Sequence, residues 1–269
     1  RLMALLSLSN IHKTFEKGTV NENHVLRGLD LDIEQGDFIS VIGGNGAGKS
    51  TLMNSITGVV EIDEGDIVLD GNSIRKASVA ARSKDISRVF QDPRMGTATN
   101  LTIEENMAIA YRRGKKRSFF KKSITEAERQ LFKDKLSELG LGLENRMKTD
   151  AAFLSGGQRQ ALTLAMATLV RPKILLLDEH TAALDPKTSD MVMQLTKKVV
   201  EEEKLTTLMI THNMEHAIEY GNRLVMLYHG KIVVDVCGEE KKNLTVAQLM
   251  DLFHKNSGQV LNDDALVLG

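Results

Sequence analysis

The chain has 269 residues, of which 42% are hydrophobic and 26% are charged, a composition typical of a globular protein. With 35 Lys and Arg residues against 36 Asp and Glu residues, its formal net charge is −1, which argues against a general nucleic-acid binder. A single cysteine excludes a disulfide framework within the chain, and no apolar run approaches the ~20 residues that span a membrane, so a role at a membrane would need separate spanning partners.

The N-terminal third predicts an antiparallel sheet followed by a buried strand and a helix. Residues 5–33 and 66–74 alternate between apolar and polar positions, as at Leu29, Leu31 and Ile33. Residues 37–42 predict a buried strand that ends at a glycine-rich turn, and residues 49–57 predict a helix that stops near Gly58.

The glycine-rich turn matches the phosphate-binding pattern G-x-x-x-x-G-K-[ST], between a strand and a helix as that pattern requires. Its glycines allow successive backbone N–H groups to point inward, and the helix N-terminus adds partial positive charge. We expect Lys49 to reach the β- and γ-phosphates of a nucleotide and the Ser50 hydroxyl to ligate Mg²⁺. A glycine-rich turn without a ligand is the alternative. The segment consists of Gly43, Gly44, Asn45, Gly46, Ala47, Gly48, Lys49 and Ser50.

The middle of the chain predicts a strand at residues 86–90 and then an inserted helical arm over roughly residues 100–170. A basic stretch at residues 112–122 lies in this arm and includes Phe119 and Phe120. It is either a solvated face or a contact with anionic lipid headgroups or a membrane partner.

A second helix start with glycines follows in the arm. Ser155 is a good N-cap, and we expect the two glycines after it to leave the helix start open to an anion. One nucleotide needs only one cradle from its own chain, so we infer that this site serves a nucleotide held by another subunit. An ordinary glycine-rich cap is the alternative. The segment reads Leu154, Ser155, Gly156, Gly157, Gln158.

An aliphatic strand at residues 173–177 leads into two acidic residues. Asp178 would lie at the carboxyl end of the strand, where ligands bind in open α/β sheets, and would hold Mg²⁺. Glu179 could polarise the attacking water as a general base. Taken alone, the pair could be an ordinary acidic turn.

The last third predicts two more strands, at residues 206–210 and 223–227, each after a helical segment. Strands that alternate with helices imply a mostly parallel sheet covered on both faces. We expect Cys237 to pack as a small residue at a strand end, and residues 241–269 to form one helix and a tail. The predicted fold is therefore an α/β core with an antiparallel β flap and a helical arm.

The order of the cradle, the Leu-Ser-Gly-Gly-Gln pentapeptide and the strand ending in Asp-Glu resembles the ABC ATPase family over residues 5–240. The resemblance implies a P-loop NTPase core with a mostly parallel sheet, an N-terminal antiparallel β subdomain and an inserted α-helical subdomain at residues 92–170. The whole ABC ATPase domain would cover residues 3–240, with a C-terminal helix and tail at residues 241–269.

Further roles follow from this resemblance alone. Gln91 would contact Mg²⁺ and water and link the core to the helical arm, and His212 would sense the γ-phosphate. Asp185 would communicate across a dimer, and Phe15 would stack on adenine. In isolation, His212 would be an ordinary strand-end histidine, and Phe15 could be a core residue. The ATP-binding set implied is Phe15, Gly43, Gly44, Asn45, Gly46, Ala47, Gly48, Lys49, Ser50, Thr51, Ser155, Gly156, Gly157, Gln158 and Asp185, with Ser50, Gln91 and Asp178 at Mg²⁺ and Glu179, His212 and Gln91 in catalysis.

The resemblance also implies partners. Two subunits, expected to be identical, would close head to tail around two ATP molecules at the cytoplasmic face of a bacterial membrane. Transmembrane permease subunits would receive the motion, and an importer would add a substrate-binding protein. No nucleic-acid partner is expected.

The turn after Glu179 departs from the family, which usually has proline where this chain has His180. The histidine would either leave the turn looser or add a titratable group. Residues 178–186 resemble a subgroup of importer ATPases assigned to tryptophan or tyrosine uptake.

Two other classes remain open. A non-transport ABC ATPase, such as an iron–sulfur assembly subunit, would copurify with scaffold proteins instead of a permease. A different P-loop enzyme, such as a small-molecule kinase, would leave His212 and the 155–158 segment unexplained.

Overall fold

The computed structural model describes residues 4–113, 115 and 123–257. By its internal contacts, the chain divides into two compact units, residues 1–82 with 205–269, and residues 83–204. Most of the basic stretch at residues 112–122, including its two phenylalanines, lies outside the described residues. Of the described helices, none is both long and apolar enough to cross a membrane.

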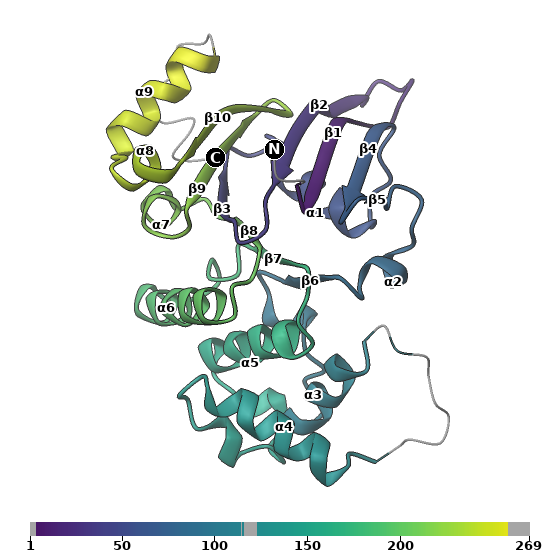
Figure 1. Cartoon of the computed structure of the whole chain (residues 1–269), viewed down its shortest axis with the longest axis vertical. Coiled ribbons are helices and arrows are strands. Elements are labelled where there is room, and N and C mark those ends of the chain that lie inside the picture. The colour runs from purple at the N-terminus through teal and green to yellow at the C-terminus, as the bar shows by residue number, and fades with distance from the viewer. Residues whose placement is uncertain (1–3, 114, 116–122, 258–269) are drawn as a thin grey trace. The chain divides into compact units, whose positions relative to one another are not determined.

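An antiparallel sheet forms the N-terminal part of the first unit, as the alternating pattern predicts. Its strands lie in the order β2-β1-β4-β5. Leu29, Leu31 and Ile33 are all buried, because alternate side chains of a strand face the same side. The strands span Leu6–Phe15 (β1), Asn23–Ile33 (β2), Glu64–Leu69 (β4) and Asn72–Ser73 (β5) (Figure 1).

A second set of strands in the same unit is built around β3, all of whose residues are buried. β3 pairs in parallel with β8 on one side and with β9 on the other. Strands buried on both faces read as continuous aliphatic runs, which is why the sequence revealed these three. The strands span Phe38–Ile42 (β3), Thr207–Ile210 (β8), Arg223–Tyr228 (β9) and Lys231–Cys237 (β10).

The last of these strands, β10, was predicted only as a strand end at Cys237, without bounds. It pairs antiparallel with β9 and alternates between buried residues, such as Val234 and Val236, and exposed ones. The expectation that Cys237 packs at a strand end is wrong in part: it ends β10, but the alternation leaves its thiol on the exposed face.

The described part of the C-terminal segment contains one complete helix after residue 241, as expected, and a short helix that was not predicted begins before it at Gly238. Leu249 and Phe253 of the second helix pack in an apolar core with Val234 and Val236 of β10. The helices of the first unit span Lys49–Thr57 (α1), Val79–Arg82 (α2), Met214–Glu219 (α7), Gly238–Lys242 (α8) and Val246–Ser257 (α9).

The second unit combines two parallel strands with the helical arm. The strands are Ile86–Val89 (β6) and Ile174–Asp178 (β7). Over its described residues the arm is helical, as predicted, apart from one isolated bridge between Thr102 and Asp150. The boundaries predicted for it, residues 92–170, stay a prediction. The helices span Ile103–Tyr111 (α3), Glu126–Ser137 (α4), Gly156–Leu169 (α5) and Pro186–Glu202 (α6), with 3₁₀ turns at Pro93–Met95 (η1), Leu143–Asn145 (η2) and Ala151–Phe153 (η3).

Candidate functional site

The glycine-rich segment connects the end of β3 to the start of α1, as predicted. Gly46 and Gly48 have φ angles of 76° and 108°, in the left-handed region that glycine enters without strain. Gly43 meets a different requirement, because a Cβ there would lie 2.6 Å from the Leu227 carbonyl oxygen. A Cβ at Gly44 would meet no atom within 4 Å. The fold of the loop therefore requires glycine at three of its four glycine positions.

Two neighbouring segments hold this loop in place. The N–H of Gly230, in the turn between β9 and β10, donates to the Ala47 carbonyl at 3.0 Å. A Cβ on Gly48 would lie 2.9 Å from the Leu26 side chain of β2. Gly230 itself approaches β2 so closely that a Cβ would lie 2.1 Å from the Val25 oxygen. The loop is thus preformed by packing on both sides.

Lys49 begins α1 and turns its buried side chain back over the loop. Its ammonium donates to the carbonyl oxygen of Gly43 and, at 3.2 Å, to that of Gly44. The N-cap of α1, Gly48, supplies no side-chain hydrogen bond, whereas α3, α4, α5, α6 and α7 each begin with a side-chain cap. A helix start that has no side-chain cap and lies beside a lysine suits an anionic ligand such as a phosphate.

Phe15 lies at the end of β1, on the sheet that supports the loop. Phe15 pairs with Asn23 of β2. Two residues further along β2, Val25 and Leu26 contact the loop. Phe15 is 37% exposed, and the Lys13 ammonium lies 5.4 Å from the centre of the Phe15 ring. A core role does not fit this exposure, while an exposed ring on the supporting strand suits stacking on a base.

His212 follows β8 and is exposed at the sheet edge where β3 enters the loop. The parallel register pairs Val41 with Ile210, and the N–H of Thr211 donates to the Val41 oxygen at 3.1 Å. Directly after the histidine, Asn213 caps α7 by accepting from the N–H of His216 at 2.9 Å. The first unit therefore brings the loop and His212 to one edge.

In the second unit, Gln91 and Glu179 occupy equivalent positions just after two neighbouring parallel strands. The parallel register pairs Val89 of β6 with Leu177 of β7, and each candidate follows its strand's paired residue by two positions. The carboxyl ends of parallel strands are where ligands bind in open α/β sheets. Gln91 is exposed and Glu179 is half-buried.

Asp178 is held by an arginine that the sequence analysis missed. The Arg88 guanidinium lies 2.6 Å from the Asp178 carboxylate, and the two side chains are 14% and 18% exposed. The same guanidinium lies 4.7 Å from the centre of the Phe90 ring. The available signal was a charged residue inside a strand, Ile86–Val89, whose other residues are all buried.

The three residues predicted at Mg²⁺ offer the oxygen donors that this hard cation prefers. Ser50 carries a hydroxyl and is exposed in the first turn of α1. Gln91 offers an amide oxygen and Asp178 a carboxylate, both at the carboxyl edge of β6 and β7. The donor set therefore fits Mg²⁺.

The pentapeptide forms the start of α5, with Ser155 as N-cap as predicted. The Ser155 hydroxyl accepts from the N–H of Gln158 at 3.2 Å, and the Gln158 side chain accepts from the N–H of Ser155 at 3.1 Å. Gly157 does not leave the helix start open, because a Cβ there would lie 2.4 Å from the Thr188 side chain of α6. That part of the expectation is wrong: Gly157 allows close packing, and only Gly156 is exposed.

Asp185 caps α6 and accepts from the N–H of Thr188 at 3.1 Å. Hydrogen bonds from the side chain and backbone of Thr188 hold the pKa of Asp185 below its usual range. The carboxylate therefore stays charged at the helix start, where the helix dipole favours it.

The candidate residues fall into two sets. Phe15, the 43–51 loop and His212 belong to the first unit, whereas Gln91, Asp178, Glu179, Asp185 and the 155–158 segment belong to the second. The roles assigned to single residues stay predictions.

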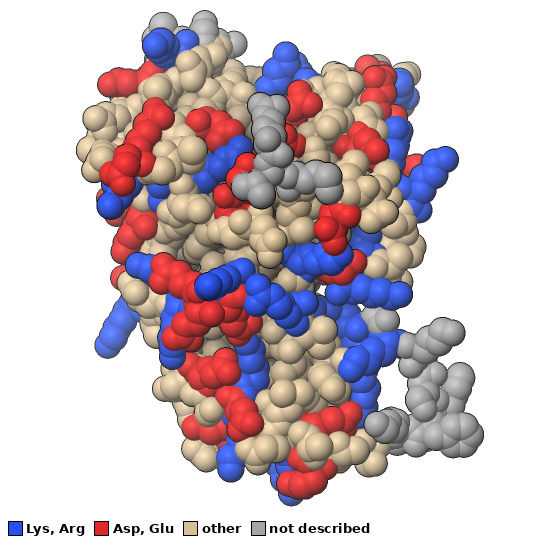
Figure 2. Space-filling model, in the orientation of Figure 1, with Lys and Arg blue, Asp and Glu red and all other residues tan. Residues whose placement is uncertain are grey.

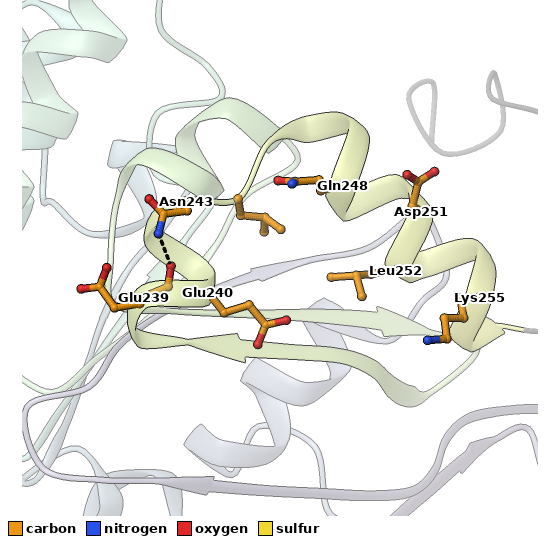
Figure 3. Close-up of a pocket in the computed structure, with 8 residues that line it drawn as sticks. Glu239, Glu240, Asn243, Gln248, Asp251, Leu252 and Lys255 are labelled. Carbon is orange, nitrogen blue, oxygen red and sulfur yellow. Dashed lines mark hydrogen bonds between the residues drawn. The ribbon is translucent and has the colours of Figure 1, made fainter.

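A cavity of about 610 Å³ lies in the first unit, between α8 and α9 (Figure 3). Leu244 and Leu252 supply its apolar lining, and Glu239, Glu240 and Asp251 supply acidic groups. No candidate nucleotide residue lines it. Figure 2 shows acidic and basic side chains interspersed among the described residues of the face in view, so charge alone does not single out a ligand site there.

Comparisons with known proteins show which family and which folds this chain resembles. Residues 26–182 match the family described as ABC transporter. A tyrosine transport ATP-binding protein of Clostridioides difficile is 45% identical over 93% of this chain and 98% of its own. A phosphonates import ATP-binding protein of Lactobacillus johnsonii is 33% identical over 97% of this chain and all of its own.

Two solved structures resemble the fold. A nucleotide-free ATP-binding cassette from an ABC transporter has a TM-score of 0.76 and 26% identity, over 93% of this chain and 99% of its own. A dimeric ATP-binding cassette in a post-hydrolysis state, bound to ADP and Pi, has a TM-score of 0.72 and 29% identity, over 86% of this chain and 98% of its own.

Proposed function

The chain belongs to the ABC transporter family, and from this premise we propose that it is the subunit that binds and hydrolyses ATP to power solute import through separate membrane subunits. The observation that carries the proposal is the preformed loop at residues 43–50. Three of its glycines are required by its fold, Lys49 lies over it, and α1 begins there without a side-chain cap.

In this proposal, different residues of the chain have different roles in the transfer of the γ-phosphoryl group to water. The 43–51 loop and Lys49 hold the phosphates, and Phe15 stacks on the adenine. Glu179 accepts a proton from the attacking water, and His212 contacts the γ-phosphate. Ser50, Gln91 and Asp178 would hold Mg²⁺, which would supply positive charge beside the phosphate oxygens.

We propose that the active form is a dimer of two such chains. The phosphate loop lies in the first unit of the chain, whereas the 155–158 segment lies in the second, where it begins α5 with Ser155 and Gly156 exposed. One solved relative is dimeric and bound to ADP and Pi, which supports a shared nucleotide site. Each ATP would then lie between the loop of one chain and Ser155 to Gln158 of its partner.

The cargo proposed is an aromatic amino acid of the tyrosine type. The support is the 45% identity to a tyrosine transport ATP-binding protein, together with the resemblance of residues 178–186. A permease and a substrate-binding protein would complete the system, with this chain at the cytoplasmic face of the membrane. Addition of tyrosine to the reconstituted complex should raise its ATPase rate; stimulation by methionine or a phosphonate instead would contradict this cargo.

The first experiment replaces Glu179 with Gln and measures both ATP hydrolysis and oligomeric state by size-exclusion chromatography with light scattering. We expect hydrolysis to be lost and a dimer to appear only with MgATP, because bound nucleotide can no longer be turned over. The matched control is Glu202→Gln, an exposed glutamate in the last turn of α6, which should hydrolyse ATP like the wild type.

Two results would contradict the proposal. Hydrolysis by Glu179→Gln at the wild-type rate would mean that another group is the base. A monomer with MgATP, both in isolation and in the membrane complex, would contradict the shared site.

A further inference from the structure

A buried glutamine connects two of the segments that carry candidate catalytic residues. Gln160 lies on α5, two residues after Gln158, and is 1% exposed. Its side-chain Nε2 donates to the Phe90 carbonyl at 2.8 Å and also to the His180 carbonyl. Because carbonyl oxygens can only accept, the amide nitrogen has to face them, and this fixes the orientation of the amide.

Both carbonyls adjoin candidate catalytic residues. Phe90 directly precedes Gln91, and His180 directly follows Glu179. Glu179 itself has φ of 48°, a left-handed conformation that costs a non-glycine residue about 1 kcal/mol and persists only where the surroundings enforce it. A hydrogen bond to the next peptide unit is one such constraint.

The His180 side chain supplies a second constraint. It is 2% exposed, and its Nε2 lies 2.9 Å from the Thr196 hydroxyl of α6. The same hydroxyl lies 2.8 Å from the Val192 carbonyl, so it links the His180 ring to the backbone of α6. Both the backbone and the ring of His180 are therefore anchored by hydrogen bonds.

We infer that Gln160 and His180 are positioning residues that hold the backbone of Glu179 and couple it to the Gln91 segment and to the helix begun by Ser155. This inference rests on the proposed ATPase function. The Gln160 side-chain amide, which α5 carries, bonds to both segments. A displacement of α5 would therefore change both hydrogen bonds at once, the one to the Gln91 segment and the one to the Glu179 turn. Neither side chain is assigned a contact with nucleotide.

The test compares Gln160→Leu with Asn106→Leu. Asn106 is an equally buried amide, on α3, whose Nδ2 donates to the carbonyls of Ala98 and Thr102 at 2.9 and 3.0 Å, away from the Glu179 turn. Both variants lose a buried amide and should lose comparable stability in urea unfolding. We expect only Gln160→Leu to lower kcat, by about tenfold to a hundredfold, since small displacements of a reacting group have effects of this size. Its KM and its affinity for a fluorescent ATP analogue should stay within about threefold of the wild type.

A second pair tests the His180 anchor without a large change in packing. Thr196→Val removes the hydroxyl at nearly constant volume and should lower kcat in the same direction as Gln160→Leu. His180→Gln keeps an N–H donor on the side chain and should retain more activity than His180→Leu.

The outcomes separate this inference from the proposed function. If Glu179→Gln is inactive while Gln160→Leu and Thr196→Val keep the wild-type kcat, the positioning role is overturned and the ATPase proposal stands. If Asn106→Leu lowers kcat as much as Gln160→Leu does, the effect is a general loss of packing and the inference is also overturned. If Glu179→Gln keeps the wild-type rate, Glu179 is not the catalytic base, and the inference that Gln160 and His180 position it is overturned as well.

Discussion

At the scale of single residues, the four glycines of the loop at 43–50 are present for different structural reasons. Gly46 and Gly48 supply left-handed backbone, Gly43 allows close approach to β9, and Gly44 is sterically unrestrained. The sequence motif identifies all four without saying which of them the fold requires.

Alanine substitution should therefore give a graded loss of stability along the loop. Gly44→Ala should be nearly neutral in urea unfolding, and Gly46→Ala should lose about 1 kcal/mol from its φ angle. Gly48→Ala should lose more, about 2 kcal/mol or above, since its φ angle and its contact with Leu26 both oppose a Cβ. Equal losses at Gly44 and Gly48 would contradict this account.

The Arg88–Asp178 pair predicts a measurable coupling. Removal of one charge leaves the other partly buried without this partner, so Arg88→Met or Asp178→Asn alone should destabilise the chain by about 2–3 kcal/mol. The double variant should lose less than the sum, with a coupling of about 1–3 kcal/mol in a double-mutant cycle from urea unfolding. Additive losses would show that the pair contributes no net interaction.

At the scale of elements, several helix starts are specified by residues close in sequence, whereas the end of one helix is also bound by a residue about 20 positions away. Thr102, Thr125 and Ser155 each close a capping box within three residues, so the sequence contains the complete signal. The end of α7 is bound by Lys241 of α8, whose buried ammonium donates to the carbonyls of residues 218, 220 and 221. No local pattern predicts that contact.

Lys241 also predicts a pH dependence. Burial lowers the pKa of Lys241 to about 8 from an ordinary 10.5, with the charge of Glu219 opposing the change. Between these values the unfolded chain binds more protons than the folded chain, so this residue's contribution to the free energy of unfolding rises with pH. We expect wild type to gain about 1–3 kcal/mol over Lys241→Met from about pH 7.5 to 10 in urea unfolding.

The control for this experiment is Lys242→Met, because the neighbouring side chain is 74% exposed. Its stability should follow the wild type at every pH. A constant difference between wild type and Lys241→Met across the same range would mean that Lys241 titrates as it does in the unfolded chain.

At the scale of the whole molecule, the phosphate loop and the 155–158 segment lie in different units of one chain. In the proposed dimer, each nucleotide uses one segment from each chain. That arrangement is open to a complementation test, because two different defects can be placed on the two chains.

Lys49→Ala and Ser155→Arg should each abolish hydrolysis alone, and mixing them should restore part of it. A mixed dimer holds one site with both defects and one site with neither, so equal amounts should recover up to about a quarter of the wild-type rate. The measurement is steady-state phosphate release against the mixing ratio. No recovery, with mixed dimers present by light scattering, would contradict the head-to-tail site.

The sequence by itself determined the strands at β3, β7, β8 and β9, the α1 cradle and the order of the motifs, because continuous aliphatic runs, glycine spacing and caps are local signals. Tertiary structure decided what depends on residues far apart in the chain. It decided that Gly157 is packed, that Arg88 holds Asp178, that β10 exposes Cys237, and that Gln160 bonds to the peptides beside Gln91 and Glu179. Those contacts join residues up to 90 positions apart, and only the pairing of strands and the packing of helices bring them within hydrogen-bonding distance.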